Sequence, residues 1–159
     1  MCCFYKSPIR SGFSFCYTST MKLLIKKIDE SAKLPTRAHH NDAGIDLYAC
    51  GEYVVNPHQT ITISLGIAME IEEGYVGLIW DKSSLGSKGI KTLGGVIDAS
   101  YRGEVKVMVH NLEEEAYTFE HGHKVAQILI QKVEFPDIIE TQEFSESTRG
   151  EGSFGSTGK

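Results

Sequence analysis

The residues with the greatest potential for chemistry lie at positions 94–104, where the sequence is GGVIDASYRGE. An acid, Asp98, and an aromatic residue, Tyr101, stand three positions apart, and the residues just before them are small or apolar. The pattern predicts a tight hairpin that enters a strand. We interpret this hairpin as the floor of an active site.

The stretch DKSSLG, residues 81–86, follows an apolar segment. It offers a cation, Lys82, and the two hydroxyl groups of Ser83 and Ser84. Such a stretch is either a plain turn with a helix cap or a loop that contacts phosphate groups. The residues alone leave both interpretations open.

Two further polar residues interrupt apolar segments. Asp46, within AGIDLYA, is either a turn acid or a group directed at the water shell of a metal ion. Gln127, within KVAQILI, either satisfies a buried backbone group or reaches a ligand, because a polar side chain in an apolar strand needs a partner.

The C-terminal residues 149–159, RGEGSFGSTGK, are rich in glycine. Gly150, Gly152 and Gly155 match the GxGxxG spacing of dinucleotide-binding sites. A Rossmann site also needs a preceding strand, a following helix and an acid about twenty residues further on, and this context is missing from the sequence pattern. The stretch is therefore either a disordered tail or an arm whose backbone amides wrap phosphate oxygens.

The elements that must position these residues are short strands separated by glycine, proline and asparagine turns. The pattern predicts an all-β fold, a distorted jelly-roll-like sandwich or barrel, with a turn or two of helix at residues 83–88. The expected strands cover residues 21–28, 43–49, 53–55, 59–64, 66–71, 75–80, 104–111, 116–119 and 124–135.

A chain of 159 residues with 41% hydrophobic content suits one globular domain. We expect this β domain at residues 21–144 and a flexible glycine-rich arm at residues 145–159. Residues 1–20 contain no Asp or Glu and are rich in Ser, Thr and Cys. We expect them to be a disordered leader or an upstream start, with Met21 opening the folded protein; a mitochondrial transit peptide is the alternative.

The formal net charge of −5 indicates which partners to expect. It argues against nucleic acid, because proteins that bind a duplex depend on a basic face. No apolar run approaches the roughly 20 residues of a membrane span, so we expect no membrane partner. An anionic substrate would need local compensation by a metal ion or by a few placed cations.

Of the four cysteines, three fall near the N-terminus and only Cys50 lies in the body. This distribution does not suit a disulfide framework, so we expect a reducing compartment, the cytoplasm, with organellar targeting by the leader as the alternative. No two CxxC pairs occur at zinc-ligand spacing. His121 and His123 are therefore expected to lie in a turn between strands, with metal ligation as the alternative.

Five segments, in the order AGIDLYA, DKSSLG, GGVIDASYRGE, GHKVAQILI and RGEGSFGSTG, resemble the five motifs of the trimeric dUTP diphosphatases, or dUTPases. The resemblance extends from Met21 to Lys159. It implies a jelly-roll fold, a homotrimer with shared active sites, and Mg²⁺ as the cofactor. It also implies hydrolysis of dUTP to dUMP and diphosphate by attack of water at the α-phosphorus, which limits the incorporation of uracil into DNA.

The resemblance further implies roles for the residues of the predicted hairpin. Asp98 would orient and deprotonate the attacking water and would meet the sugar 3′-hydroxyl. Tyr101 would pack under the deoxyribose and leave no room for a 2′-hydroxyl. The groups implied to contact the uracil edge belong to the backbone of residues 92–97, including Thr92, Val96 and Ile97, and to the side chain of Lys106.

The remaining motifs are implied to bind the phosphates and the metal. Ser83 and Ser84, with Lys82 before them, would contact the phosphates. Asp46 and Gln127 would hold ordered water around a Mg²⁺ ion chelated by the triphosphate. The arm would close over the nucleotide, usually at the site of a neighbouring subunit, with Phe154 stacked on the base. The implied arm residues are Arg149, Phe154, Gly155, Ser156 and Thr157.

Four positions depart from the family pattern. Lys82 stands where the family usually has Arg, which removes a bidentate contact to phosphate or to a partner carboxylate. Thr92 replaces an Asn that often contacts uracil, Ser100 replaces an Asp, and Ser153 replaces a Gly in the arm. These changes concern base selectivity and arm geometry more than the reaction itself.

Two alternatives to the dUTPase remain open. A dCTP deaminase, or a bifunctional deaminase and diphosphatase, shares the fold and needs a carboxylate at the pyrimidine ring, for which Glu104 is the nearest candidate. Tyr101 and the complete arm favour the dUTPase. The second alternative is a non-catalytic, nucleotide-binding regulator, which loss of the base or of the arm would indicate; both are retained.

Overall fold

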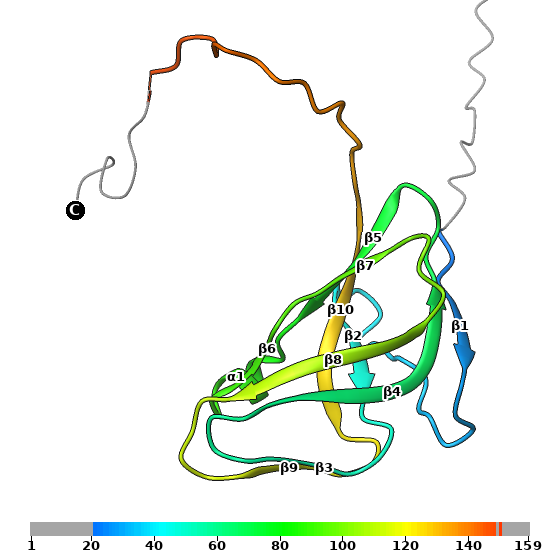
Figure 1. The fold of residues 1–159 in the computed structure, drawn as a ribbon. Helices are drawn as coiled ribbons and strands as arrows, with labels where there is room; N and C mark the ends of the chain where they lie inside the picture. Colours follow the sequence, from blue (N-terminus) through cyan, green and yellow to red (C-terminus); the bar gives the residue numbers. More distant parts are fainter. Residues whose placement is uncertain (1–20, 149, 151–159) are drawn as a thin grey trace, which may run out of the picture.

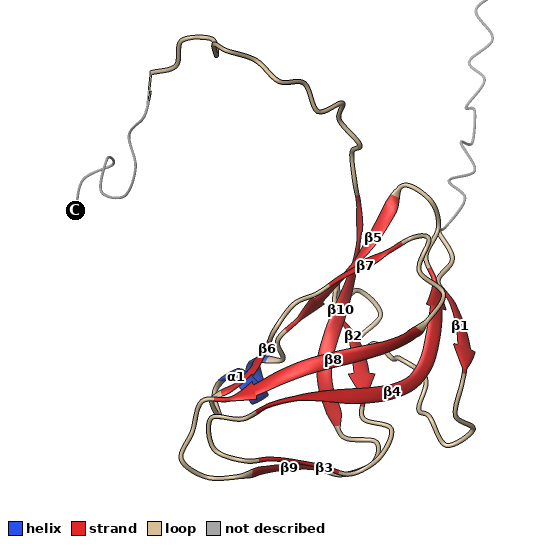
Figure 2. Ribbon diagram, viewed as in Figure 1, coloured by secondary structure: helices blue, strands red, loops and turns tan. Residues whose placement is uncertain are grey.

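The computed structural model describes residues 21–148 and residue 150. This part of the chain folds into ten strands and one short helix (Figures 1 and 2). In chain order the elements are β1 (Leu24–Lys27), β2 (Ile45–Tyr48), β3 (Tyr53–Val55), β4 (Thr60–Glu70), β5 (Tyr75–Trp80), α1 (Ser83–Gly86), β6 (Ile90–Thr92), β7 (Val96–Asp98), β8 (Glu104–Asn111), β9 (Tyr117–Phe119) and β10 (Lys124–Lys132).

Two four-stranded sheets pack against each other through one hydrophobic core. Their strand orders are β1-β4-β8-β6 and β2-β10-β5-β7, whereas β3 and β9 form a separate two-stranded ribbon. Buried side chains of both sheets, such as Val107 of β8 and Ile128 of β10, belong to the same cluster. The predicted all-β sandwich is therefore confirmed.

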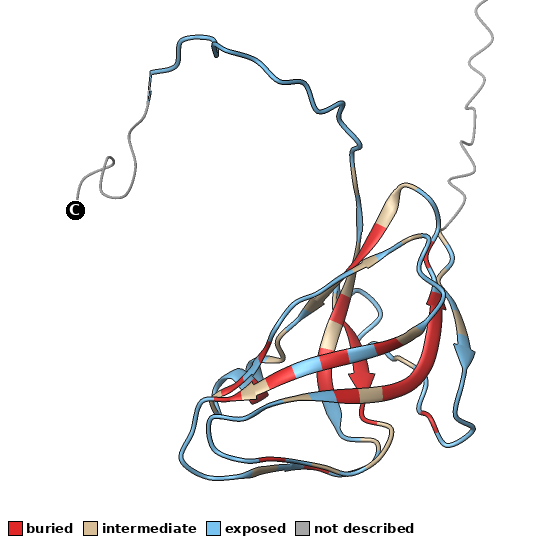
Figure 3. Cartoon of the chain, viewed as in Figure 1, coloured by how far each residue is buried: buried red, intermediate tan, exposed pale blue. Residues whose placement is uncertain are grey.

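The pattern of β8 shows why these segments form strands. Val105, Val107 and Val109 are buried, whereas Lys106 and Met108 between them are exposed, and Figure 3 shows this alternation along the strand. Successive side chains of a strand point to opposite faces, so three β-branched residues enter the core. Each buried valine stabilises the fold by roughly 1.5–3 kcal/mol.

The segments 59–64 and 66–71, which we expected to be two strands, form the single strand β4. The pairing of β4 with β8 becomes irregular around Gly66, whose φ is 64°. This left-handed backbone favours glycine, and a Cβ at this position would also lie 2.7 Å from the sulfur of Cys50. The glycine thus marks a β-bulge within one strand and not a break between two.

The stretch 94–104 is not a hairpin, in contrast to the expectation from its sequence. Strand β7 pairs with β5, whereas β8 pairs with β4 and β6, so the strands at the two ends of the stretch belong to different sheets. Residues 99–103 therefore cross from one sheet to the other. The strand β6 was not expected either, because its three residues are too few to establish an alternating pattern.

The expected turn of helix is present as α1. It follows Lys82, whose backbone is extended with φ −84° and ψ 130°, and its buried residue Leu85 anchors it to the core. Among the described residues, no helix has the length and apolar character needed to cross a membrane.

The chain leaves the body at the end of β10, which stops at Lys132 and not at residue 135 as expected. Residues 134–148 are exposed throughout, and this segment extends away from the sheets (Figure 1). Its large apolar side chains are between 76% and 100% exposed, and they are Phe135, Ile138, Ile139 and Phe144. The extended part of the chain thus begins before the predicted start of the arm at residue 145.

Candidate active site

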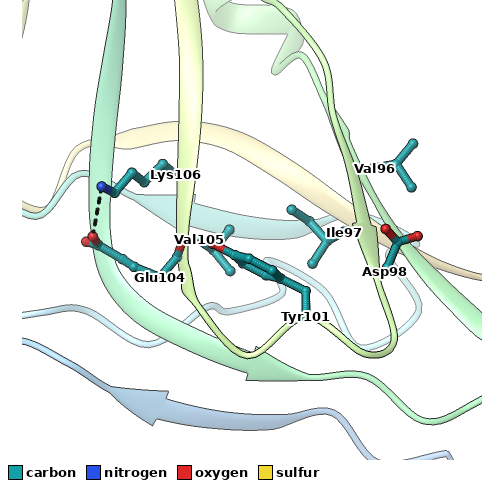
Figure 4. Close-up of a pocket in the computed structure, with 7 residues that line it drawn as sticks. All are labelled: Val96, Ile97, Asp98, Tyr101, Glu104, Val105 and Lys106. Atoms are coloured by element: carbon teal, nitrogen blue, oxygen red, sulfur yellow. Dashed lines mark hydrogen bonds and ion pairs between the residues drawn. The ribbon is translucent and has the colours of Figure 1, made fainter.

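One cavity brings together six of the residues that the sequence analysis singles out. It has a volume of 360 Å³ and lies between β7 and the start of β8. Because these strands belong to different sheets, the cavity opens between the sheets and not inside a hairpin. Its lining residues are Val96, Ile97, Asp98, Tyr101, Glu104, Val105 and Lys106 (Figure 4).

Asp98 ends β7 with an exposed side chain. Its backbone oxygen accepts a hydrogen bond from the N–H of Tyr101 at 3.0 Å, and this turn directs both side chains to the same cavity. From the described part of the chain, the Asp98 carboxylate receives no hydrogen bond and no ion pair. Both of its oxygens are therefore available to a water molecule and to a ligand hydroxyl.

Tyr101 is held at its hydroxyl end. The hydroxyl donates a hydrogen bond to the backbone oxygen of Glu104 at 3.0 Å, and the residue remains 43% exposed. In Figure 4 the ring lies between Asp98 and the side chains that come from β8. A ring fixed in this way offers its face as a flat packing surface.

Glu104 orients Lys106 on the wall formed by β8. Its Oε2 lies 3.4 Å from the Lys106 ammonium group, and its Oε1 accepts hydrogen bonds from the Ser64 hydroxyl and, at 3.2 Å, from the N–H of Gly66. The hydrogen bond from Ser64 is the main reason why the pKa of Glu104 lies below its ordinary value. The carboxylate consequently stays ionised and keeps the Lys106 ammonium group at the cavity.

Asp46, Lys82 and Gln127 lie together in a second cavity, which has a volume of 290 Å³. Asp46 is buried on β2 between two ammonium groups. Its Oδ1 lies 2.7 Å from the Nζ of Lys82, and its Oδ2 lies 2.6 Å from the Nζ of Lys124. The carboxylate thus holds two cations at one cavity, which is the local compensation that an anionic ligand needs in a net-acidic protein.

Gln127 is close-packed in this second cavity. Its side-chain amide donates to the backbone oxygen of Asp81 at 2.8 Å. Gly44 gives it room, because a Cβ at residue 44 would lie 1.9 Å from the amide oxygen of Gln127. The side chain therefore satisfies a backbone group and still presents its oxygen at the cavity wall.

The other predicted site residues lie outside these two cavities. Ser83 and Ser84 are exposed at the start of α1, directly after Lys82. Thr92 is buried at the end of β6 and borders a third hollow of 310 Å³, which shares Val96 with the cavity of Asp98. The arm residues Arg149, Phe154, Gly155, Ser156 and Thr157 lie outside the described residues, as does the leader.

A single chain keeps Asp98 and Gln127 apart. Strand β5 lies between β7 and β10, and Asp98 pairs with its residue Val76, whereas Gln127 pairs with Trp80. Four residues along the strand and two strand spacings give a separation of about 16 Å between the two Cα atoms. Asp46 lies on the far side of β10 and is further away.

His121 and His123 lie in the predicted turn, which connects β9 to β10. Gly122 between them has a φ of 78°, and the Nδ1 of His121 accepts a hydrogen bond from the N–H of Gly51 at 3.1 Å. Over residues 21–148 and 150, no three His, Cys, Asp or Glu side chains are grouped so that they could hold a metal ion.

Two residues of these sites were missed in the sequence. The sequence pattern predicts Lys124 only as the first residue of a strand, although a cation three positions before Gln127 is a signal for a role at the same site. The sequence places Asp81 in a turn or a phosphate-contacting loop without a role of its own, but its carboxylate contacts Lys91 and Thr92 of β6. No local signal indicates this contact, because it depends on the arrangement of the sheets.

Asp46 is expected to make the stability of the protein depend on acidic pH. Burial alone would raise the pKa of this carboxyl group, but the hydrogen bonds from Lys124 and Lys82 outweigh it and lower the pKa below its ordinary value. Such a group stabilises the fold above its unfolded pKa, about 3.9, and this contribution is lost as the pH falls through the lower, folded pKa. The melting temperature should therefore decline below about pH 4, and less steeply in Asp46→Asn.

Thermal unfolding followed by circular dichroism between about pH 7 and pH 2 measures this dependence. Asp42→Asn is the matched control, because Asp42 lines the same cavity without a lysine partner. An equal change of slope in both variants would show that the lysine pairs of Asp46 are not the cause.

The amino-acid sequence matches the dUTPase family over residues 30–158. The deoxyuridine 5′-triphosphate nucleotidohydrolase of Mycolicibacterium gilvum is 38% identical over 145 residues, which cover 86% of this chain and 94% of that protein. The enzyme of the same name from Clostridium tetani is 42% identical over 140 residues, which cover 86% of this chain and 97% of that protein.

Solved structures with the same fold include dUTPases of bacteriophages. The dUTPase of Staphylococcus bacteriophage 80alpha with dUPNHPP superimposes with a TM-score of 0.83 at 30% identity, covering 87% of this chain and 99% of that one. A mutant dUTPase of phage phi11 of S. aureus, studied for the coordination of a structural Mg(II) ion, gives a TM-score of 0.72 at 27% identity, covering 77% and 98%. The predicted jelly-roll-like fold is therefore confirmed.

Proposed function

The chain belongs to the dUTPase family, and from this premise we propose that it hydrolyses dUTP to dUMP and diphosphate. The observation that carries the proposal is the cavity in which Asp98, Tyr101 and Lys106 meet. An acid, a ring and a cation on one surface can serve, respectively, the reaction, the sugar and the base of a nucleotide.

In the proposed reaction Asp98 is the general base. Its carboxylate holds a water molecule and takes one of its protons while the water oxygen attacks the α-phosphorus. The bond between the α-phosphorus and the oxygen that bridges to the β-phosphate breaks, and diphosphate leaves with the bonding electrons. Positioning of the water is the main contribution of the protein, because attack requires the reacting atoms to be close and aligned.

Tyr101 and Lys106 provide the proposed selectivity. The ring of Tyr101 packs under the deoxyribose and excludes a 2′-hydroxyl, and Lys106 contacts the edge of uracil together with the backbone of residues 92–97. The position of Val96 supports this assignment, since it borders both the cavity of Asp98 and the hollow beside Thr92.

The second cavity is the proposed site of the phosphates, which Lys82, Ser83 and Ser84 contact. Magnesium would arrive chelated by dUTP and would disperse the charge of the triphosphate. Asp46 is suited to contact the Mg²⁺ ion through water molecules, because its two oxygens bind lysines but retain lone pairs that can accept hydrogen bonds from water. Mg²⁺ commonly keeps several of its waters, and the oxygen of Gln127 is a further acceptor for them.

We infer that the complete site forms between subunits of a homotrimer. Asp98 and Gln127 of one chain are about 16 Å apart, so the second cavity that meets Asp98 belongs to a neighbour. The exposed apolar residues of segment 134–148 support assembly, because a single chain leaves them in water. The arm, residues 145–159, would close over the site with Phe154 on the base.

The surroundings of Glu104 argue against a dCTP deaminase or a bifunctional enzyme. A carboxyl group that shuttles protons at the pyrimidine ring must exchange its proton near the working pH. The hydrogen bond from Ser64 keeps the pKa of Glu104 low, and its second oxygen is occupied by Lys106. Retention of Asp98 leaves the non-catalytic regulator without support.

The purified protein with Mg²⁺ is expected to release diphosphate from dUTP and to prefer dUTP over dCTP, dTTP and UTP by roughly 10²-fold or more. Tyr101 would exclude the ribose of UTP, and the contacts at the base edge would exclude the methyl group of thymine and the amino group of cytosine. Parallel assays of diphosphate and of ammonia measure hydrolysis and deamination, respectively. Ammonia from dCTP would instead identify a deaminase, and no product from any nucleotide would contradict the proposed function.

A further inference from the structure

β6 is an edge strand whose outer side needs a hydrogen-bond partner. Among the strands of residues 21–148 it pairs only with β8, at one end of the order β1-β4-β8-β6. The N–H of Leu93 donates to Met108 of β8 at 3.0 Å. Because N–H directions alternate along a strand, the N–H of Thr92 points away from β8. Thr92 is only 8% exposed, so this group requires an acceptor within the protein.

Asp81 supplies that acceptor from the opposite sheet. Its Oδ1 accepts hydrogen bonds from the N–H of Thr92 at 2.7 Å and from the Thr92 hydroxyl at 2.5 Å, and its Oδ2 pairs with the ammonium group of Lys91. Asp81 directly follows β5, which belongs to the sheet β2-β10-β5-β7. One carboxylate therefore joins the end of β5 to the end of β6 by charge-assisted hydrogen bonds.

Asp81 is itself fixed by contacts within the sheet β2-β10-β5-β7. The backbone oxygen of Asp81 accepts the hydrogen bond from the side chain of Gln127 at 2.8 Å, so the residue is held by β10 as well as by β5. A shift of Asp81 would break its contact with Gln127 within one sheet or its contacts with Thr92 of the other sheet.

Beyond Thr92 the chain enters the segment that the proposed function assigns to the base. Residues 93–95 are exposed and lie outside the strands, and Val96 starts the wall that leads to Asp98. This segment is held at its beginning by Asp81 and by the hydrogen bond from the N–H of Leu93 to Met108, and at its end by the hydrogen bond from the N–H of Ile79 to the oxygen of Gly95 and by the pairing of β7 with β5. The placement of its backbone groups therefore depends on both attachments.

We propose that Asp81 is a positioning residue that sets base selectivity by fixing the backbone at Thr92. The inference rests on the proposed function. Removal of the carboxylate leaves the Thr92 N–H without its acceptor, so that the start of the base-contacting segment is held only by the pairing with β8. The groups that distinguish uracil from cytosine then lose their alignment, whereas Asp98 and Tyr101 keep theirs.

The test compares kcat and KM for dUTP and dCTP in full-length wild-type protein and in Asp81→Ala. We expect the KM for dUTP to rise about tenfold and the preference for dUTP over dCTP to fall about tenfold, while kcat for dUTP changes by less than about threefold. Asp81→Asn keeps an acceptor oxygen for Thr92 and should recover most of the preference. Lys91→Met is the matched control, since it removes the ion pair but leaves the Thr92 contacts, and it should keep the preference within about twofold.

The outcomes are distinguishable from loss of stability and from failure of the proposed function. A lower melting temperature with an unchanged ratio of dUTP to dCTP turnover would show that Asp81 only stabilises the fold and would overturn the proposal. If Asp81→Ala does not fold, Asp81→Ser, whose hydroxyl is too short to reach Thr92, is judged by the same ratio. A wild-type protein that hydrolyses neither nucleotide would overturn the proposed function and this inference together, whereas a preference retained without the carboxylate would overturn the role of Asp81 alone.

Discussion

Asp98→Asn is expected to lower kcat for dUTP by roughly 10²- to 10⁴-fold while nucleotide binding stays nearly unchanged. The amide has the shape of the carboxylate but cannot take a proton from the attacking water. The other walls of the cavity, including Tyr101 and Lys106, do not depend on this side chain for their contacts. Steady-state hydrolysis gives kcat, and calorimetric titration with dUPNHPP gives the dissociation constant.

The control for this prediction is Asp137→Asn, which removes one negative charge from the exposed segment after β10. Its kcat should stay within about twofold of the wild-type value, because surface charges contribute little. Near-normal turnover in Asp98→Asn would remove Asp98 from the role of base. Equal losses of turnover and of dUPNHPP binding would make Asp98 a binding residue and not a base.

Mixing two inactive variants is expected to restore about one quarter of the wild-type activity. One variant is Asp98→Asn, and the other combines Lys82→Ala with Gln127→Ala. If a site takes Asp98 from one subunit and the second cavity from another, each contribution is intact with a chance of about one half in randomly reassembled trimers. The product gives the expected activity, measured as dUTP hydrolysis after joint refolding.

A chain that carries all three substitutions, mixed with an equal amount of wild-type protein, distinguishes the two geometries again. A shared site should leave about one quarter of the activity, and a site within one chain about one half. Light scattering of each variant and of the mixture checks that trimers form. A mixture of the two inactive variants that stays inactive would refute the shared site.

Local patterns predicted the parts of the site that depend on neighbours in the sequence. Asp98 and Tyr101 share a cavity because the hydrogen bond between residues 98 and 101 closes a turn, and the alternation in residues 104–111 identified β8. The sequence pattern predicts two strands on either side of Gly66, where the structure has a bulge in one strand, because a glycine between apolar residues is compatible with a turn and with a bulge.

Contacts between distant segments could not be predicted in the same way. Lys124 reaches Asp46 because β10 lies beside β2, and Asp81 reaches Thr92 because β5 and β6 end near each other in opposite sheets. The sheet to which β7 belongs is likewise decided by packing, since its three residues are too few to carry a pattern, and the alternation in β8 does not indicate which strands it pairs with. Each missed feature thus depends on the topology and not on the local residues.

The assignment of β7 and β8 to different sheets has a consequence for the width of the cavity between them. Residues 99–103 span two layers, and packed sheets lie about 10 Å apart, at a distance set by the side chains between them. Ile97 and Val105 contribute to both the cavity wall and the hydrophobic core. A longer or shorter core side chain between the two sheets is therefore expected to change the width of this cavity without being part of its lining.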